Sequence, residues 1–204
     1  VAALESVWAA EPDAGAIARD VAGLGIQESA AAAGLLVELR QSAYFRRLDE
    51  FGRRRLATLL PLLLSEIATA VGGDRGADEL VLLARLIRII EAIGGRTTYL
   101  ALLNENASAL ARLVSVCRLG DYLARQVAAH PLLLDELLDS RIFDTLPDRE
   151  QFRRELAIRL EHAGDDLERQ VDALRHFRRA ATFRIAMQDL TGHLPLMQVS
   201  DRLT

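Results

Sequence analysis

The stretch that decides the fold is RTTYLALLNENASALARLVSVCRLGDYLARQVAAHPLLLDELLD, from Arg96 to Asp139. Its apolar residues recur three or four positions apart, which is the spacing of a helical face and not the alternation of a strand. This spacing predicts several short helices joined by very short loops. The residues that carry the pattern are Leu100, Leu103, Leu110, Leu113, Val114, Leu119, Leu123, Val127, Leu133, Leu134, Leu137 and Leu138.

Polar residues inside this stretch fall where helix ends need them. Asn104 and Asn106 are predicted to accept hydrogen bonds from the free N–H groups that open the next helix, and Asp121 is predicted to cap a helix from Tyr122. Pro131 suits the first turn of a helix, because its missing N–H would have no partner there. The residues just before it therefore predict a corner between two helices.

The rest of the chain carries the same helical pattern. Four consecutive alanines make the segment 27–41 a strong helix former, with Gly34 as its one weak position. Pro61 falls inside an apolar run and is expected either to bend a helix or to start a new one. Further helices are predicted over 13–22, 56–71, 79–93, 148–162 and 166–191, with Asp78, Asp148 and Asp165 before the last three.

These patterns predict an all-α protein, an irregular helical bundle of roughly eight to eleven helices with no sheet. Glycine-rich segments at 72–76 and 94–95 are the candidate boundaries. The second would divide the chain into a helical linker or regulatory region, 1–95, and a helical region, 96–204, that leads into a further domain. One continuous helical domain is the alternative. The segment 140–147 is expected to be extended, and a last helix to begin near residue 196.

The composition argues against several classes of protein. Half of the residues are hydrophobic and only 5% are aromatic, as in helical bundles. A net charge of −4 disfavours nucleic-acid binding, which needs a positive excess. The apolar runs 56–71 and 80–93 are shorter than the ~20 residues of a membrane span. The single cysteine, Cys117, is expected to be a buried, inert thiol in a reducing compartment, so we expect a cytoplasmic protein.

No stretch of the sequence carries a catalytic motif, whether phosphate-binding, dinucleotide-binding or metallohydrolase. Asp172 and His176 stand four residues apart on one predicted helix, yet no second cluster completes a metal site. The pairs Asp135–Glu136 and Asp165–Asp166 could hold magnesium. Both fall at predicted helix starts, however, where acidic residues are favoured by capping and the helix dipole. We therefore predict no catalytic, cofactor-binding or metal-binding residue in this chain.

Arginines gather along the last long predicted helix. Guanidinium groups suit phosphates and carboxylates, so this flank is a candidate partner-facing surface for a nucleotide, an acidic partner or a missing part of the chain. The alternative is a solvated face with internal pairs to Glu168 and Asp172. The candidate flank consists of Arg175, Arg178, Arg179 and Arg184, with Arg169 one turn and a half before them.

The decapeptide HPLLLDELLD at 130–139 is the most specific of several short stretches that, by their residues and their order along the chain, resemble the glutamine synthetase adenylyltransferase family. The resemblance spans roughly residue 55 to the C-terminus. The other matching pieces are YLALL at 99–103, the segment 110–117, DALR at 172–175, RIA at 184–186, LPLM at 194–197 and VSD at 199–201.

The resemblance implies a cytoplasmic, bifunctional bacterial enzyme that moves AMP from ATP onto a tyrosine of glutamine synthetase and removes it again by phosphorolysis. It also implies two nucleotidyltransferase domains that use Mg²⁺, with the PII signal protein and glutamine as regulators. The Gly-Ser turn and Asp-x-Asp pair of those domains have no counterpart in this sequence. Neither catalytic centre is therefore carried over to any residue.

We expect a non-catalytic helical fragment that positions the two active sites of such an enzyme and relays PII and glutamine signals. The start at Val1, without methionine or cap, and the helix expected at the C-terminus both fit a piece cut from a longer protein. One alternative is a stand-alone, all-helical protein-interaction adaptor. Another is that the fragment itself binds a small effector such as glutamine. No nucleic-acid or membrane partner is expected.

Overall fold

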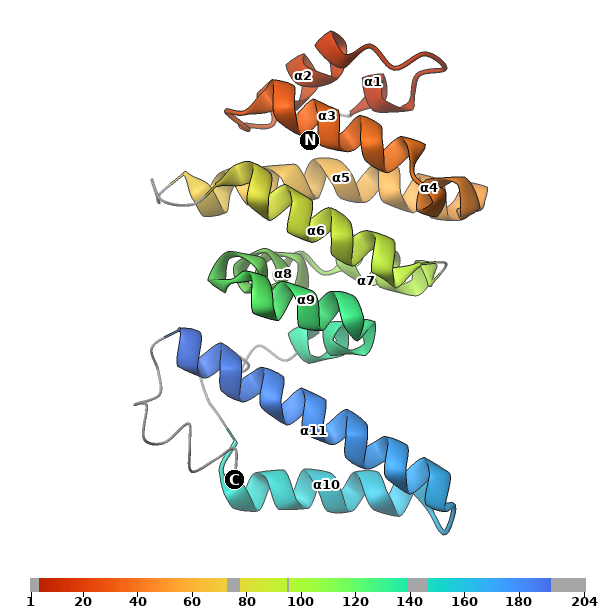
Figure 1. Ribbon diagram of the computed structural model, residues 1–204, viewed down its shortest axis with the longest axis vertical. Helices are drawn as coiled ribbons and strands as arrows, with labels where there is room; N and C mark the ends of the chain where they lie inside the picture. Colours follow the sequence, from red (N-terminus) through yellow and green to blue (C-terminus); the bar gives the residue numbers. More distant parts are fainter. Residues whose placement is uncertain (1–3, 73–77, 95, 139–146, 192–204) are drawn as a thin grey trace. The chain divides into compact units, whose positions relative to one another are not determined.

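The computed structural model describes residues 4–72, 78–94, 96–138 and 147–191, and these form eleven α-helices and one 3₁₀-helix (Figure 1). No strand occurs among the described residues, so the predicted all-α fold is confirmed. The elements are α1 (Glu5–Trp8), α2 (Ala14–Gly23), α3 (Ser29–Gln41), α4 (Ala43–Arg47), α5 (Glu50–Val71), α6 (Glu79–Ile93), α7 (Thr97–Glu105), α8 (Ala107–Leu119), α9 (Asp121–Ala129), η1 (Pro131–Leu138), α10 (Arg149–Ala163) and α11 (Leu167–Leu190).

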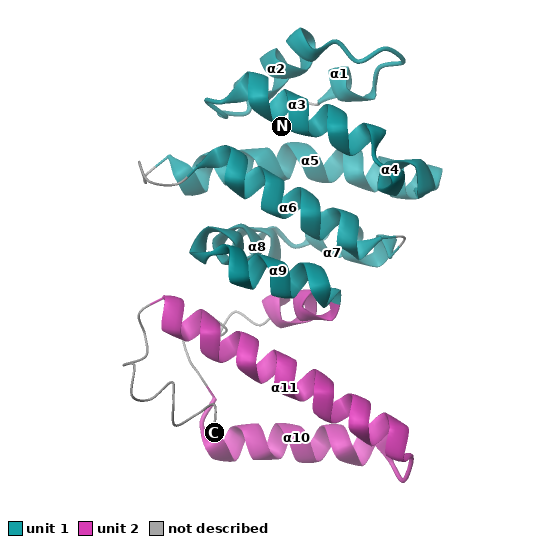
Figure 2. Cartoon of the chain, viewed as in Figure 1, with its two compact units in different colours: residues 1–131 teal, residues 132–204 magenta. Residues whose placement is uncertain are grey.

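The chain divides into two compact units (Figure 2). Unit 1 is Val1–Pro131 and unit 2 is Leu132–Thr204. The predicted regions 1–95 and 96–204 are a different partition of the chain and stay a prediction. The glycine-rich loop at 73–76, the extended segment at 140–146 and the helix expected from residue 196 lie outside the described residues.

Helices α5 and α6 form the centre of unit 1. They contact each other, α3 packs on α6, and α7, α8 and α9 pack on the pair (Figure 1). Both helices bury a broad aliphatic face, because their Leu and Ile residues recur at helical spacing. The side chains with 2% exposure or less include Leu56, Leu59, Leu60, Leu63, Leu64 and Ile67 of α5 and Leu82, Leu83, Leu86, Ile89, Ile90 and Ile93 of α6.

Pro61 lies inside α5, which runs without a break from Glu50 to Val71. The expectation that a new helix begins at Pro61 is therefore wrong. A proline in a helix interior removes one backbone hydrogen bond, at a cost of about 3 kcal/mol. Burial of the leucines on both sides of Pro61 offsets this cost, since each contributes roughly 2 kcal/mol.

Side-chain caps fix several helix ends as predicted. Asp78 accepts a hydrogen bond from the Leu80 N–H at 2.8 Å, and Asn106 accepts one from the Ala109 N–H at 3.0 Å. Asp148 forms a reciprocal capping box with Gln151. Each cap satisfies N–H groups that have no partner within their own helix.

Three predicted caps are wrong. Asp166, and not Asp165, caps α11 by accepting from the backbone of Glu168 at 2.9 Å. Asn104 ends up inside α7, where its Nδ2 donates to the Arg55 carbonyl of α5 at 2.9 Å. Asp121 is the first residue of α9 and makes no side-chain cap. In the last two cases the side chain instead bonds to a residue of another helix that is far away in the sequence.

A buried carboxylate supplies the cap that α3 lacks locally. Glu79 opens α6, is only 8% exposed and accepts hydrogen bonds from the backbone N–H groups of Gln27 at 2.8 Å and Glu28 at 3.3 Å. Glu28 is the residue before α3 and makes no cap of its own. One carboxylate thus joins the starts of α3 and α6.

Unit 2 contains η1 from its second residue onward and the helices α10 and α11, which pack on each other. Phe152 of α10 and Phe177 of α11 make an edge-to-face contact with ring centroids 5.9 Å apart. None of the fifteen residues of α10 is fully buried. The buried side chains of unit 2 lie elsewhere, at Leu133, Leu134, Leu137, Ala180, Phe183, Ile185, Met187 and Gln188 among its described residues.

Two helical glycines test the packing of unit 1. Gly34 of α3 has no atom within 4 Å of the place where a Cβ would stand. At Gly52 of α5 the Cβ would lie 2.9 Å from a Leu48 methyl group and 3.2 Å from the Thr97 methyl group, so glycine permits the close approach of α7. We expect Gly34→Ala to raise the free energy of unfolding by about 0.5–1 kcal/mol and Gly52→Ala to lower it by about 1 kcal/mol.

Urea unfolding of the two variants, which share the same chemical change, measures both shifts. Stabilisation by Gly52→Ala equal to that by Gly34→Ala would contradict the α5–α7 packing.

Candidate functional site

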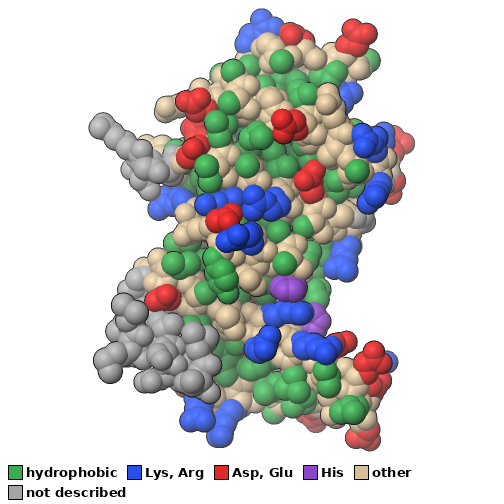
Figure 3. Space-filling view, viewed as in Figure 1, with side chains coloured by type: hydrophobic (Ala, Val, Ile, Leu, Met, Phe, Trp, Pro, Cys, Tyr) green, Lys and Arg blue, Asp and Glu red, His purple; other side chains and the backbone are tan. Residues whose placement is uncertain are grey.

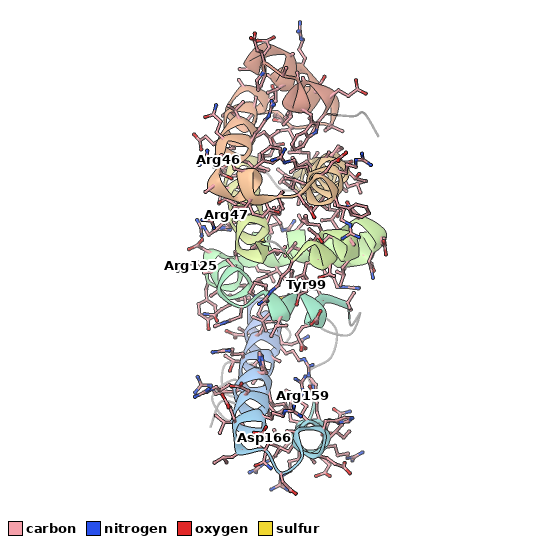
Figure 4. The ribbon with its side chains drawn as sticks, turned by 90° about the vertical axis from the view of Figure 1, so that its right-hand side faces the viewer. Arg46, Arg47, Tyr99, Arg125, Arg159 and Asp166 are labelled. Atoms are coloured by element: carbon pink, nitrogen blue, oxygen red, sulfur yellow. The ribbon has the colours of Figure 1, made fainter. Side chains whose placement is uncertain are left out.

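The most enclosed ion-pair network among the described residues joins four side chains of unit 2 and is here called the Arg184 network. It joins Glu136 of η1, Glu155 and Arg159 of α10, and Arg184 of α11. The Arg184 Nε donates to Glu136 at 2.7 Å, and its Nη1 donates to Glu155 at 2.7 Å. Arg159 donates to Glu155 at 2.6 Å (Figure 4 labels Arg159).

The electrostatics of the Arg184 network are balanced, with two carboxylates and two guanidiniums. The side chains of Arg184 and Glu136 are only 17% and 11% exposed. Burial alone would raise the pKa of Glu155, but hydrogen bonds and charge from Arg184 and Arg159 outweigh it and lower that pKa. Burial likewise opposes the charge of Arg184, yet Glu155 and Glu136 raise the pKa of the guanidinium.

This network links η1, α10 and α11 with charge-assisted hydrogen bonds. It places polar links in a unit where α10 contributes no fully buried side chain. Removing one partner would leave the other charges partly enclosed and unneutralised, which costs more than the pair contributes by itself. The arrangement is therefore suited to holding helices together. The guanidinium of Arg184 is already engaged by two carboxylates.

We expect Glu155→Gln to lower the free energy of unfolding by about 1–2 kcal/mol at neutral pH. The lowered pKa of Glu155 means that its stabilising effect is fully present above the ordinary glutamate pKa and is lost as pH falls through the lower, folded-state value. The wild-type chain should therefore lose more stability than Glu155→Gln between about pH 5 and about pH 3.

Thermal unfolding followed by circular dichroism at several pH values measures this difference. Glu161→Gln, at an exposed position of the same helix, is the matched control and should change stability by less than about 0.5 kcal/mol. Equal losses in acid for wild type and Glu155→Gln would refute the role of the network.

The predicted arginine flank does not form one surface. Arg175 and Arg178 are exposed and Arg179 is half-buried, whereas Arg184 is held inside the Arg184 network. Arg175 pairs with Asp172 at 3.1 Å, which is the internal pair weighed as the alternative. A partner-facing role for these residues stays a prediction.

A second charged group lies on the surface of unit 1. In this Asp121 cluster, three arginines surround one carboxylate: Arg125 at 3.0 Å and Arg88 at 3.3 Å, with Arg85 farther away at 3.7 Å. Arg85 also donates to the Cys117 carbonyl at 2.7 Å. Figure 3 shows arginine side chains gathered around an acidic one over α6 and the α8–α9 pair.

The sequence contained only part of the signal for this cluster. Arg85 and Arg88 are three apart on α6, and Asp121 and Arg125 are four apart on α9, so each pair is visible as helical spacing. The meeting of α6 with α9 is a tertiary contact between helices about thirty residues apart. The three arginines thus pair with Asp121, the residue that the sequence predicts as a helix cap.

One member of each acidic pair that was considered for magnesium has another partner. Asp166 caps α11, and Glu136 belongs to the Arg184 network. Asp135 and Glu136 are the fifth and sixth residues of η1, not its start. Burial raises the pKa of Asp135, which weakens it as a cation ligand. Within the described ranges no group of three His, Cys, Asp or Glu residues is placed to hold a metal ion.

Cys117 is fully buried in α8, as predicted. Burial raises its pKa to about 12, although Arg85 and Arg88 act in the opposite direction. The thiol is therefore protonated at neutral pH and has little nucleophilic character.

The part of the chain that the structure describes contains no helix with the length and hydropathy of a membrane span.

The fold and these charged groups define an all-helical segment whose enclosed ions tie helices together. Comparison with known proteins adds its family. Residues 110–204 match the family model described as Glutamate-ammonia ligase adenylyltransferase. The relatives below are each described as a bifunctional glutamine synthetase adenylyltransferase/adenylyl-removing enzyme.

The relative from Pseudomonas putida is 38% identical over 97% of this chain, and the one from Thioalkalivibrio sulfidiphilus is 38% identical over 100% of it. The relative from Nitrosococcus oceani is 44% identical over 83% of this chain. The chain belongs to the glutamine synthetase adenylyltransferase family, as the resemblance in its sequence predicted. It spans about a fifth of the length of these relatives, with 20%, 20% and 17% covered.

Proposed function

We propose that this chain is a non-catalytic helical connector in an enzyme that adenylylates and deadenylylates glutamine synthetase. Two observations support the proposal. The relatives bear the name of that bifunctional enzyme, and this chain spans a fifth of their length. The described residues are helical and offer no group of metal ligands. The ATP and Mg²⁺ of the reaction would be bound by nucleotidyltransferase domains elsewhere in the longer protein.

A third observation, the continuous aliphatic core of α5 and α6, carries most of the proposal. A connector that sets the spacing of two catalytic domains has to resist bending, and close packing of fully buried side chains gives a protein interior that resists deformation. Leu60, Leu64, Leu86 and Ile90 all have 0% exposure. Very short connections add to this, since only Ser42 separates α3 from α4, and only Asn106 separates α7 from α8.

We extend the proposal to partners and regulation. Glutamine synthetase would be the protein substrate of the longer enzyme, and the PII signal protein and glutamine would be its regulators, acting in the cytoplasm. A connector relays a regulatory signal when its helices have two alternative arrangements. Binding at each end must then stabilise one arrangement more than the other. The exposed arginines of α11 are candidates for contact with a partner.

The test is a pair of double variants in η1 of the longer enzyme. Leu133 and Leu137 are 5% and 0% exposed, whereas Leu132 and Leu138 of the same element are 44% and 45% exposed. We expect Leu133→Ser/Leu137→Ser to unfold this region, because each change removes a buried side chain worth about 2–5 kcal/mol and buries a hydroxyl. The ratio of adenylylation to deadenylylation should then no longer respond to glutamine or PII.

Leu132→Ser/Leu138→Ser makes the same chemical change at exposed positions and should leave that response intact. Limited proteolysis establishes whether the region has unfolded. A normal glutamine and PII response in an enzyme whose connector is demonstrably unfolded would exclude the connector role.

A further inference from the structure

The Asp121 cluster carries more positive charge than its own carboxylate neutralises. Three guanidiniums face one carboxylate, which leaves an excess of two positive charges on a chain whose net charge is −4. Arg85 is largely enclosed, with 19% of its side chain exposed. Arg88 and Arg125 are 51% and 65% exposed, so the excess charge is open to solvent.

The hydrogen-bonding capacity of the cluster is also largely unused by Asp121. Each guanidinium carries five N–H donors in a fixed plane, and a carboxylate has two oxygens. Arg125 reaches one oxygen of Asp121, while Arg85 and Arg88 approach the other. The planar, forked edges of Arg88 and Arg125 suit bidentate bonds to further carboxylates.

Exposed apolar side chains flank the charged residues. Val81 lies one helical turn before Arg85 on α6 and is 41% exposed, and Tyr122 follows Asp121 on α9 and is 49% exposed. Tyr122 is three residues before Arg125, which places the two on neighbouring positions of the helix surface. Arginine and tyrosine are the side chains that protein interfaces favour as anchors.

We propose that this surface, made of Val81, Arg88, Tyr122 and Arg125 around Asp121, binds an acidic segment of a partner protein. A segment with carboxylates and an apolar side chain uses both the guanidinium edges and the apolar flanks. A free phosphate uses only the charge. A phosphate can bind the outer edge of Arg88 or Arg125 as a carboxylate does, but it has no apolar group to place against Val81 or Tyr122.

The probe is a fluorescein-labelled peptide of repeated Glu-Glu-Leu-Gly units, titrated with the 204-residue chain and followed by fluorescence anisotropy. The matched probe has Gln in place of Glu. The variant Arg88→Gln/Arg125→Gln removes the exposed charges and leaves Arg85 to pair with Asp121. Arg46→Gln/Arg47→Gln makes the same change at two exposed positions of α4, a different helix from the α9 that carries Arg125 (Figure 4).

We expect Arg88→Gln/Arg125→Gln to raise the Kd for the Glu peptide about tenfold or more, and the α4 control to change it less than about threefold. Tyr122→Ser keeps every charge and should still weaken binding. Equal loss in both arginine variants would overturn the proposal in favour of diffuse charge attraction. Full displacement of the peptide by inorganic phosphate, with no effect of Tyr122→Ser, would overturn it in favour of a small-anion site.

Discussion

The structure depends above all on the burial of the aliphatic faces of α5 and α6. Their leucines and isoleucines are almost completely removed from water, and each contributes roughly 2 kcal/mol. This burial keeps α5 continuous through Pro61 and gives α3, α7, α8 and α9 a common surface to pack against. The backbone conformation of the surrounding short helices follows from it, because helices of nine residues are not stable alone in water.

Charged side chains connect helices where apolar burial does not suffice. In unit 2, α10 has no fully buried residue, and the Arg184 network ties it to η1 and α11. In unit 1, Glu79 caps α3 from the start of α6. Every basic residue of the chain is arginine, and its forked geometry allows one guanidinium to serve two acceptors at once, as Arg184 does. These are structural uses of charge, and one of the residues involved, Glu136, belongs to an acidic pair that the sequence analysis considered for magnesium.

Local features of the fold were predictable from the sequence, and tertiary ones were not. The helices around Leu82–Ile93 and Leu100–Val127 follow from apolar spacing, and the caps at Asp78 and Asn106 follow from the residues next to them. The sequence predicts caps at Asp121 and Asn104 because only partners that are close in the chain can be recognised from sequence alone. Both instead bond to helices more than thirty residues away. The ion pair between Glu136 and Arg184 was equally unpredictable from the sequence, because the two residues are 48 positions apart in the chain.

The family could also be read from short stretches such as HPLLLDELLD, and the comparisons confirm it. The connector role combines that family with the helical core, so the core is the most direct thing to test. Amide hydrogen exchange of the whole chain, followed by mass spectrometry, ranks the helices by their local stability. We expect the slowest exchange in α5 and α6 and faster exchange in α10. Slowest exchange in α10, or no protection in α5 and α6, would contradict this expectation.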